Sequence, residues 1–211
     1  VKRGYEKGYD WLWLMDDDTI PTKSALENSL ECSLKVSNIG YIYSKVLWID
    51  KTPHLMYIPS IKSLINNVPF NRYEEDSLFL VETASFVSLL VNTTAVKKVG
   101  FPIKEFFIWS DDVEYTLRIT KNGFLGLYNN KSLVFHKTQK NYSATNTYDW
   151  RFYFNKRNKL WIHKMYNKKR YIFCFLSEIA RTFSYPQNLW IVNIKACLNS
   201  LFKTPKIEKD I

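Results

Sequence analysis

Short continuous apolar runs alternate with segments of helical period along the chain. The run WLWLM at 11–15 is typical of a central strand that is covered on both faces of a sheet. In the next segment leucine recurs every four residues, at Leu26, Leu30 and Leu34, which predicts a helix over 22–37. A strand followed by a helix in this way favours an α/β fold.

Residues that begin and end helices support two of the predicted helices. Ser24 with Glu27 matches a capping box at the start of the first helix. A second helix is predicted over 110–123, where Ser110 can cap the first turn and Gly123 ends the last. Both segments are therefore expected to form helices with defined ends.

Four further segments have the apolar pattern of strands or the composition of a loop. Residues 39–49 predict one strand or a strand pair, and 50–78 hold Pro, Asn and charges without a period, as a loop does. Residues 78–91 are strand-like but interrupted by Glu82. A last apolar run, SLVFHKT, ends a strand at His136.

From Tyr148 onward the pattern is helical, and aromatic residues alternate with basic ones. Acidic and basic residues balance over 1–150, so the formal net charge of +10 arises from the last part of the chain. We therefore expect an α/β domain over 1–147 and a basic, aromatic-rich helical region over 148–211. Such a region favours an anionic partner, which is a membrane surface, a nucleic acid or an acidic substrate.

The overall composition is that of a globular cytoplasmic protein. Apolar residues make up 46% of the chain, and the three cysteines lie far apart without a CxxC pair, as reduced core thiols do. No apolar run approaches the roughly 18 to 20 residues of a transmembrane helix, and no secretory signal is recognisable. The opening residues VKRGYEKG resemble the end of a helix, so we expect a chain that lacks its N-terminal part.

Three consecutive aspartates, Asp16, Asp17 and Asp18, follow the first apolar run directly. Ligands of open α/β sheets bind beyond the carboxyl ends of strands, which is where these residues lie. Since alternate residues of an extended chain point the same way, Asp16 and Asp18 can share one cation while Asp17 points elsewhere. Carboxylate oxygens suit Mg2+ or Mn2+. The alternative is a solvated turn with a helix-capping aspartate.

A second acidic group, Asp111 and Asp112, falls in the first turn of the helix predicted over 110–123. The helix dipole stabilises ionised carboxylates there, and an ionised carboxylate at a cleft can act as a general base. The alternative is that these acids, together with Glu114, simply start a helix.

His136 ends the last apolar run, where an imidazole on a neighbouring strand end could complete a carboxylate metal site. A lone histidine at such a position is more often structural. The sequence alone leaves both interpretations open.

The order of these motifs resembles family 2 glycosyltransferases of the GT-A fold, whose Rossmann-like mixed sheet is flanked by helices. The resembled subgroup contains bacterial galactofuranosyltransferases and rhamnosyltransferases of cell-surface polysaccharide synthesis. LMDDDTIP is similar to the family's metal-binding DXD motif, WSDDVEYTLR to its acidic base motif, and YFNKRN to an aromatic-Arg-Asn signature. The resemblance covers about 1–165. In the subgroup a Trp often directly precedes the two Asp, whereas here Ser110 separates Trp109 from Asp111.

The resemblance implies a role for each candidate residue of an inverting, metal-dependent sugar transferase. For metal binding, Asp16, Asp18 and His136 hold Mn2+ or Mg2+, and for proton transfer Asp112 is the base. For substrate contact, Asp111 and Trp109 orient the acceptor and Asp17 contacts donor ribose or sugar. Glu82 touches substrate unless it is structural.

The resemblance also implies partners. The donor is a nucleotide-diphosphate sugar, UDP- or dTDP-linked, and the acceptor is a glycan or a polyprenyl-linked glycan. Segments 168–183 and 189–203 mix Lys and Arg with Trp, Phe and Ile, as helices in an anionic interface do. We therefore expect a peripheral protein at the inner face of the plasma membrane. The alternative is a helical bundle that docks on the domain or on a second subunit, as in a homo-oligomer.

Three other functions remain as alternatives. A non-catalytic module that binds a membrane or a nucleic acid would use the basic, aromatic region after residue 150. Nucleic-acid binding leaves the acidic motifs without a role, so we expect no nucleic acid. A metal-dependent phosphoryl hydrolase would use the aspartate triplet, to which DDDTIPTK is a loose match. The last is an inactive transferase fragment that serves in assembly.

Overall fold

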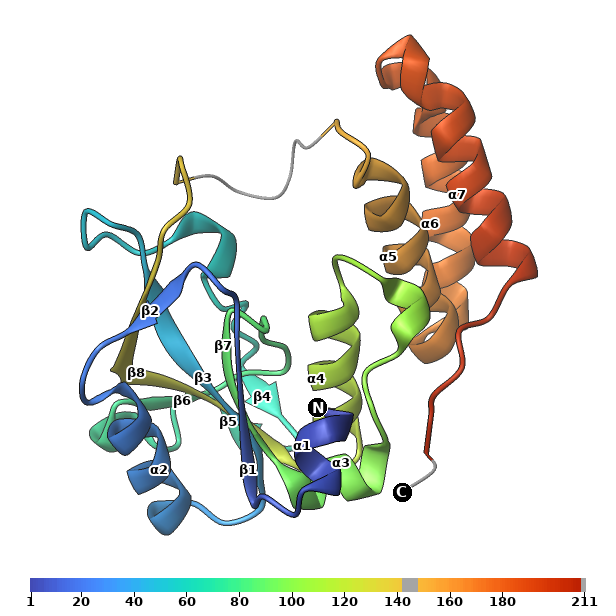
Figure 1. The fold of residues 1–211 in the computed structure, drawn as a ribbon. Coiled ribbons are helices and arrows are strands. Elements are labelled where there is room, and N and C mark those ends of the chain that lie inside the picture. Colours follow the sequence, from blue (N-terminus) through green and yellow to red (C-terminus); the bar gives the residue numbers. More distant parts are fainter. Residues whose placement is uncertain (142–147, 210–211) are drawn as a thin grey trace. The chain divides into compact units, whose positions relative to one another are not determined.

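The computed structural model describes residues 1–141 and 148–209 (Figure 1). The described residues form two compact units, each built from separate segments: 1–101, 115–141 and 209 in the first, 102–114 and 148–208 in the second. The domain boundary that the sequence predicts after residue 147 falls at the edge of residues outside the described part, so it stays a prediction.

Among the described residues, six strands form one sheet, in which β1, β7, β3, β8 and β2 lie in that order and β6 also pairs with β8. The strands and their bounds are β1 Trp11–Met15, β2 Thr19–Pro21, β3 Ile39–Leu47, β6 Leu78–Leu80, β7 Ser88–Asn92 and β8 Leu125–His136, with a separate hairpin of β4 Leu64–Ile65 and β5 Val68–Pro69. β3 runs parallel to β8 and the other pairs are antiparallel, so the sheet is mixed.

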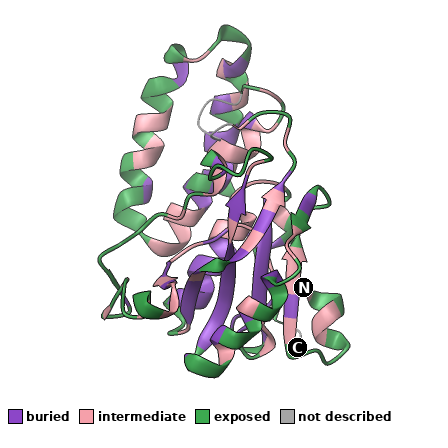
Figure 2. Ribbon diagram, turned by 90° about the vertical axis from the view of Figure 1, so that its left-hand side faces the viewer, coloured by how far each residue is buried: buried purple, intermediate pink, exposed green. Residues whose placement is uncertain are grey.

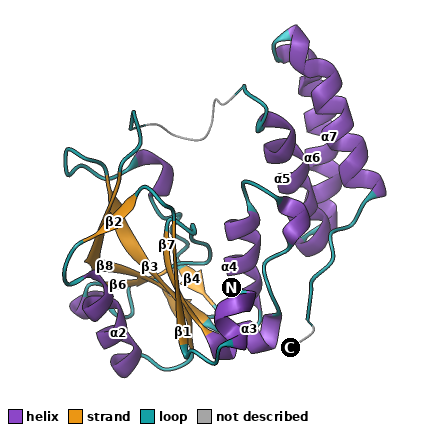
Figure 3. Cartoon of the chain, viewed as in Figure 1, coloured by secondary structure: helices purple, strands orange, loops and turns teal. Residues whose placement is uncertain are grey.

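The helices are α1 Lys2–Glu6, α2 Ala25–Lys35, α3 Thr93–Val99, α4 Asp111–Lys121, α5 Phe152–Tyr166, α6 Lys168–Ala180 and α7 Trp190–Phe202 (Figure 3). In the first unit the sheet has a helix layer on each face. Tyr41 and Tyr43 of β3 belong to a core cluster with Val96 of α3, whereas Ile42, which points to the opposite face, belongs to one with Cys32 of α2. The predicted α/β class is confirmed.

The predicted position of the first strand is wrong. β1 pairs with β7 alone and therefore lies at an edge of the described sheet, not at its centre. Of its residues only Leu12 is buried, and Met15 is exposed. The fully covered strand is β3, whose run IGYIYSKVL is buried at all but one position (Figure 2). A continuous apolar run thus does not by itself distinguish a central strand from an edge strand.

The helix predicted over 22–37 forms as α2, Ala25–Lys35, but its leucines are not its core face. Leu26, Leu30 and Leu34 are exposed, and the residues of α2 that are buried are Ala25, Ser29 and Cys32. Small side chains fit that face because α2 lies close against β8, where the Ser29 hydroxyl donates to the Ser132 hydroxyl at 2.9 Å.

The predicted capping box is also wrong. Ser24 is the N-cap residue of α2, but its side chain makes no capping hydrogen bond. Its backbone carbonyl instead accepts from the Asn28 N–H at 2.9 Å. The other predictions for this part hold in outline: 39–49 contains one strand, 78–91 contains two separate strands, and 50–78 is mostly loop.

The second unit contains α5, α6 and α7, as the helical pattern after Tyr148 predicts. Its core includes Trp161 and Leu160 of α5 and Cys197 of α7. Across the described residues, no helix has both the length and the apolarity that crossing a membrane requires.

Candidate functional site

The structure brings Asp16, Asp18 and His136 together in the first unit. The two aspartates lie in the turn between β1 and β2, and His136 is the last residue of β8. Backbone pairing between β2 and β8 sets Thr19 opposite His136, so the turn that precedes Thr19 lies beside the imidazole. Residues more than a hundred positions apart in the sequence thus meet at one end of the sheet.

The distances within this cluster suit a cation. The Nε2 atom of His136 lies 2.7 Å from Oδ1 of Asp18 and 3.9 Å from Oδ2 of Asp16. One candidate ligand atom from each residue lies within 4.8 Å of the others. The imidazole side chain is 6% exposed, whereas the two carboxylates are 47% and 45% exposed. The cluster is therefore open to solvent on its carboxylate side and rigidly supported on its histidine side.

The reason that Asp16 and Asp18 lie on one side differs from the one that the sequence suggests. β1 ends at Met15, so the aspartates are not part of an extended strand. The Thr19 N–H donates to the Asp16 carbonyl at 3.1 Å and closes a turn over the triplet. The Lys137 N–H donates to the Asp18 carbonyl at 3.1 Å and holds the turn against the strand that carries His136. A turn, and not strand alternation, pairs the two carboxylates.

Sequence reasoning missed the residues that surround His136. The rings of His54 and Tyr57 lie 5.3 Å and 5.2 Å from the His136 ring, centroid to centroid. His54 contacts Oγ1 of Thr138 through Nε2 at 2.9 Å, and its Nδ1 accepts from the Met56 N–H at 3.3 Å. Burial, and then the neighbouring His136, lower the pKa of His54. His54 therefore favours the neutral form and packs beside His136 at the site. The one sequence signal that could have suggested it is that a histidine occurs in this loop.

The donor set fits a divalent cation. Two carboxylates and one imidazole are ligands that Mn2+ and Mg2+ sites use, with Mn2+ the better match for the nitrogen. The buried Nδ1 of His136 has no hydrogen-bond partner among the described residues, so the ring is fixed by its aromatic neighbours and by Asp18. The cluster can therefore hold a cation and leave coordination positions on its exposed side.

The second acidic motif lies in the second unit, at the start of α4. Three residues in the loop directly before α4 have positive φ angles: 64° at Phe107, 63° at Trp109 and 63° at Ser110. Such angles are costly for residues other than Gly, and they persist only where the surroundings hold them. The structure therefore fixes the loop that delivers Asp111 and Asp112 into the first turn.

Two residues of α5 hold this loop by its carbonyl groups. Asn158 is fully buried, and its amide donates to the carbonyls of Phe106, Ile108 and Trp109 at 2.9, 2.9 and 2.7 Å. Arg157 donates to the carbonyl of Glu105 at 2.6 Å. The aromatic-Arg-Asn signature thus acts on the acidic motif, a connection that the spacing of the two motifs in the sequence did not indicate.

Within the second acidic motif the carboxylates have different surroundings. Burial raises the pKa of Asp111. The Oδ1 atom of Asp112 accepts from the Val113 N–H at 2.7 Å, as an acid in a first turn does. Glu114 is fully buried and accepts from the Tyr166 hydroxyl at 2.6 Å, so it is not an exposed acid of the first turn. Trp109 lies under the Arg151 guanidinium, 4.9 Å from the ring centroid.

The two remaining candidates lie elsewhere in the first unit. Asp17 is exposed at the tip of the turn. Glu82 follows β6 and forms an ion pair with Lys62. Neither residue belongs to the cluster of Asp16, Asp18 and His136. Their predicted contacts with substrate stay predictions.

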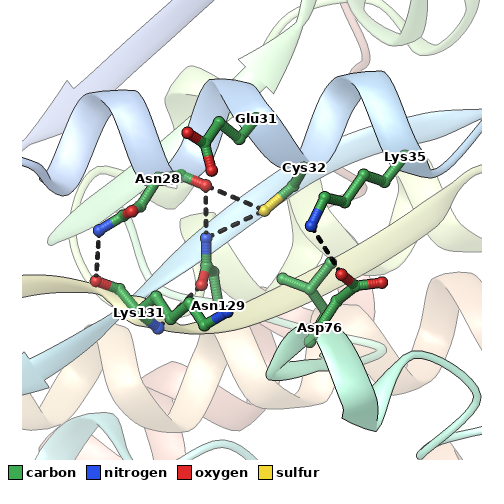
Figure 4. Close-up of a pocket in the computed structure, with 8 residues that line it drawn as sticks. Asn28, Glu31, Cys32, Lys35, Asp76, Asn129 and Lys131 are labelled. Atoms are coloured by element: carbon green, nitrogen blue, oxygen red, sulfur yellow. Dashed lines mark hydrogen bonds and ion pairs between the residues drawn. The ribbon is translucent and has the colours of Figure 1, made fainter.

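A separate pocket of the first unit lies between α2 and β8 (Figure 4). Its walls include the Lys35–Asp76 ion pair, 2.7 Å long, and Cys32, whose thiol contacts the Asn28 carbonyl and receives the Asn129 amide, both at 3.0 Å. Burial raises the pKa of Cys32 to about 11. Since a thiolate is the reactive form, this cysteine is a structural residue and not a nucleophile.

Comparison with known proteins places the fold. No family model matches the chain, and no curated protein matches it. Solved structures do match, and one of them is the crystal structure of GalNAc-T7 with UDP, GalNAc and Mn2+, with a TM-score of 0.57 at 11% sequence identity. The match covers 92% of this chain and 40% of that one, so the chain spans two fifths of its length. The chain therefore has a GT-A-like fold: a mixed sheet flanked by helices, followed by a C-terminal helical region.

Proposed function

We propose that the chain is a metal-dependent glycosyltransferase that moves a sugar from a nucleotide-diphosphate donor to an acceptor hydroxyl. The observation that carries the proposal is the cluster of Asp16, Asp18 and His136 at the end of a sheet with a GT-A-like fold. The match to a structure that holds UDP, a sugar and Mn2+ supports the same class of donor. The match shows fold alone, so the cluster's chemistry is the stronger support.

Asp16, Asp18 and His136 would hold Mn2+ or Mg2+. When bound, the cation neutralises negative charge on a diphosphate leaving group. The chain's own contribution is to fix the ligands: Asp18 is oriented by the 2.7 Å contact with Nε2 of His136, and the ring of His136 is confined by His54 and Tyr57.

In this proposal Asp112 is the general base that removes the proton of the acceptor hydroxyl. The hydrogen bond from the Val113 N–H to its Oδ1 stabilises the ionised carboxylate, which is the form that accepts a proton. Asp111 and Trp109 orient the acceptor, Asp17 contacts donor ribose or sugar, and Glu82 is a weaker candidate for substrate contact because it is paired with Lys62.

The finer assignment follows the family 2 resemblance. The donor would carry galactofuranose or rhamnose on UDP or dTDP, and the acceptor would be a glycan or a polyprenyl-linked glycan of cell-surface polysaccharide synthesis. Transfer would invert the anomeric centre, because the hydroxyl activated by Asp112 attacks from the face opposite the leaving group. Proton NMR of the first-formed product tests this directly: retained anomeric configuration would contradict the inverting mechanism.

Asp112→Asn tests the proposed base. Asn keeps an oxygen that can accept from the Val113 N–H but cannot take a proton, so we expect transfer to fall by about 100-fold or more while donor binding is unchanged. Transfer is measured as nucleotide released from the donor in the presence of acceptor. The matched control is Asp10→Asn, an exposed aspartate of the first unit. Transfer by the Asp112 variant within tenfold of the unchanged chain would exclude Asp112 as the base.

A further inference from the structure

The helical unit exposes large apolar side chains along α6 and the turn that follows it. Ile172, Leu176, Ile179 and Phe183 recur at spacings of three or four residues, which places them on one side of the helix. Phe173 and Phe183 are each 73% exposed. A helix that only docks within its own unit would bury such a stripe.

The next helix has the same property. Ile191, Ile194, Leu198 and Leu201 of α7 recur with a helical period and are exposed, and Phe202 at its end is 79% exposed. The opposite side of α7 is already used, because Asn193, Ala196, Cys197 and Ser200 are its buried residues. The apolar stripes of α6 and α7, which we call the α6–α7 apolar surface, are therefore additional to the core of the unit.

The charges around this surface have one sign. The exposed ionisable side chains of 168–203 are all basic: Lys168, Lys169, Arg170, Arg181, Lys195 and Lys203. Glu178 is the single acidic residue of that segment, and its carboxylate lies 2.7 Å from Nζ of Lys156 and accepts from the Tyr185 hydroxyl at 2.6 Å. The surroundings of the apolar surface thus favour an anionic partner.

We propose that the α6–α7 apolar surface binds the interface of an anionic lipid membrane. Helices that lie in such an interface insert aromatic and aliphatic side chains, and their Lys and Arg side chains attract anionic headgroups. A second copy of the chain is a poorer occupant, because a symmetric pair would set two basic rims against each other. The proposal does not depend on the proposed sugar transfer, since it rests on the helical unit alone.

Vesicle co-sedimentation of the 211-residue chain tests the proposal. The probes are vesicles of phosphatidylcholine and vesicles of phosphatidylcholine with phosphatidylglycerol. We expect pelleting with the anionic vesicles at low salt, and less at high salt, because salt screens the headgroup attraction. Phe173→Ser with Phe183→Ser should weaken partition by about tenfold or more. Lys168→Gln, Lys169→Gln and Arg170→Gln together should weaken it by about fivefold per cation.

The controls change matched residues of the first unit. Leu34→Ser with Ile58→Ser removes two exposed apolar side chains, and Lys7→Gln, Lys97→Gln and Lys98→Gln together remove three exposed cations. Circular dichroism checks that each variant is folded. Equal pelleting with neutral vesicles, or equal losses in the control variants, would overturn the proposal. So would absence of pelleting together with a dimer, seen by light scattering, that the Phe173 and Phe183 changes dissociate.

Discussion

At the scale of single residues, Asp111 carries a carboxyl group whose burial opposes its ionisation. Burial raises its pKa above the usual value of about 3.9, although the N–H groups of the first turn oppose that rise. The folded chain therefore prefers the protonated carboxyl, and the stability that Asp111 contributes is fully present below about pH 4. That contribution is lost as the pH rises through the raised pKa of the folded state.

Asp111→Asn should therefore stabilise the chain near neutral pH, since an amide keeps the shape without the buried charge. We expect a higher midpoint of thermal unfolding than that of the unchanged chain at pH 7, and the same midpoint below about pH 4. Differential scanning calorimetry at both pH values measures this. An unchanged or lower midpoint at pH 7 would contradict the inference that burial dominates at Asp111.

Residue types and spacing indicated which side chains could form a cation site but not what surrounds them. Acids after one apolar run and a histidine after another made Asp16, Asp18 and His136 candidates, the family resemblance grouped them, and the structure brings the three together. Nothing local to His54 or Tyr57 indicates that they pack against His136. The loop that carries His54 and Tyr57 reaches His136 through tertiary contacts. Local sequence pattern does not predict such contacts.

At the scale of elements, two side chains of α5, Arg157 and Asn158, hold the loop before α4, and Asn158 makes most of the contacts. The two N–H donors of the Asn158 amide are shared among three backbone carbonyls of a loop that contains left-handed residues at Phe107, Trp109 and Ser110. Without Asn158 these carbonyls would lose a hydrogen-bond donor in a buried environment, which costs free energy of folding. The loop is thereby kept in a conformation that its own sequence does not favour.

Asn158→Ala should destabilise the chain by about 2 to 4 kcal/mol, since it leaves buried carbonyls without a donor and a cavity beside them. Denaturation in urea gives the free energy of unfolding. The matched control is Asn155→Ala on the same helix, a half-buried asparagine, which should cost less than about 1 kcal/mol. A cost for the Asn158 variant no larger than that of the control would show that the loop is held in another way.

Proteolysis distinguishes a loosened loop from a general loss of stability. Native chain and Asn158→Ala are compared under conditions where both remain folded, and early cleavage sites are mapped by mass spectrometry. We expect new cleavage between Phe106 and Ser110 in the variant, because the freed carbonyls let the strained loop open. Cleavage elsewhere only would contradict a local role of Asn158.

Two elements show why periodicity predicted secondary structure better than packing. The leucine period of α2 predicted a helix correctly, yet the helix turns Ala25, Ser29 and Cys32 to the sheet because close approach to β8 admits small side chains. The apolar run of β1 predicted a strand correctly, yet that strand lies at the edge of the described sheet. The spacing of apolar residues predicts whether a segment is a helix or a strand. Which face of that element is buried depends on neighbours that are distant in sequence.

At the scale of the whole chain, the distribution of charge separates the regions that the sequence predicted. Acidic and basic residues balance over 1–150, and the excess of +10 belongs to 151–211. The sequence predicted the α/β class from alternating strands and helices, and the GT-A-like fold from the order of its motifs. It did not predict that 102–114 belongs to the helical unit, because contacts from α5 to those residues decide it.

The proposed cation site of Asp16, Asp18 and His136, on which a nucleotide diphosphate would bind, is central to the proposed function. Isothermal titration calorimetry of UDP into the chain tests it, with Mn2+ and then with EDTA, for the unchanged chain, for Asp18→Asn and for the control Asp10→Asn. We expect saturable binding with Mn2+, loss of binding in EDTA, and binding weakened by at least about tenfold in Asp18→Asn alone. UDP binding that is absent with Mn2+, unchanged by EDTA or unchanged in Asp18→Asn would contradict it.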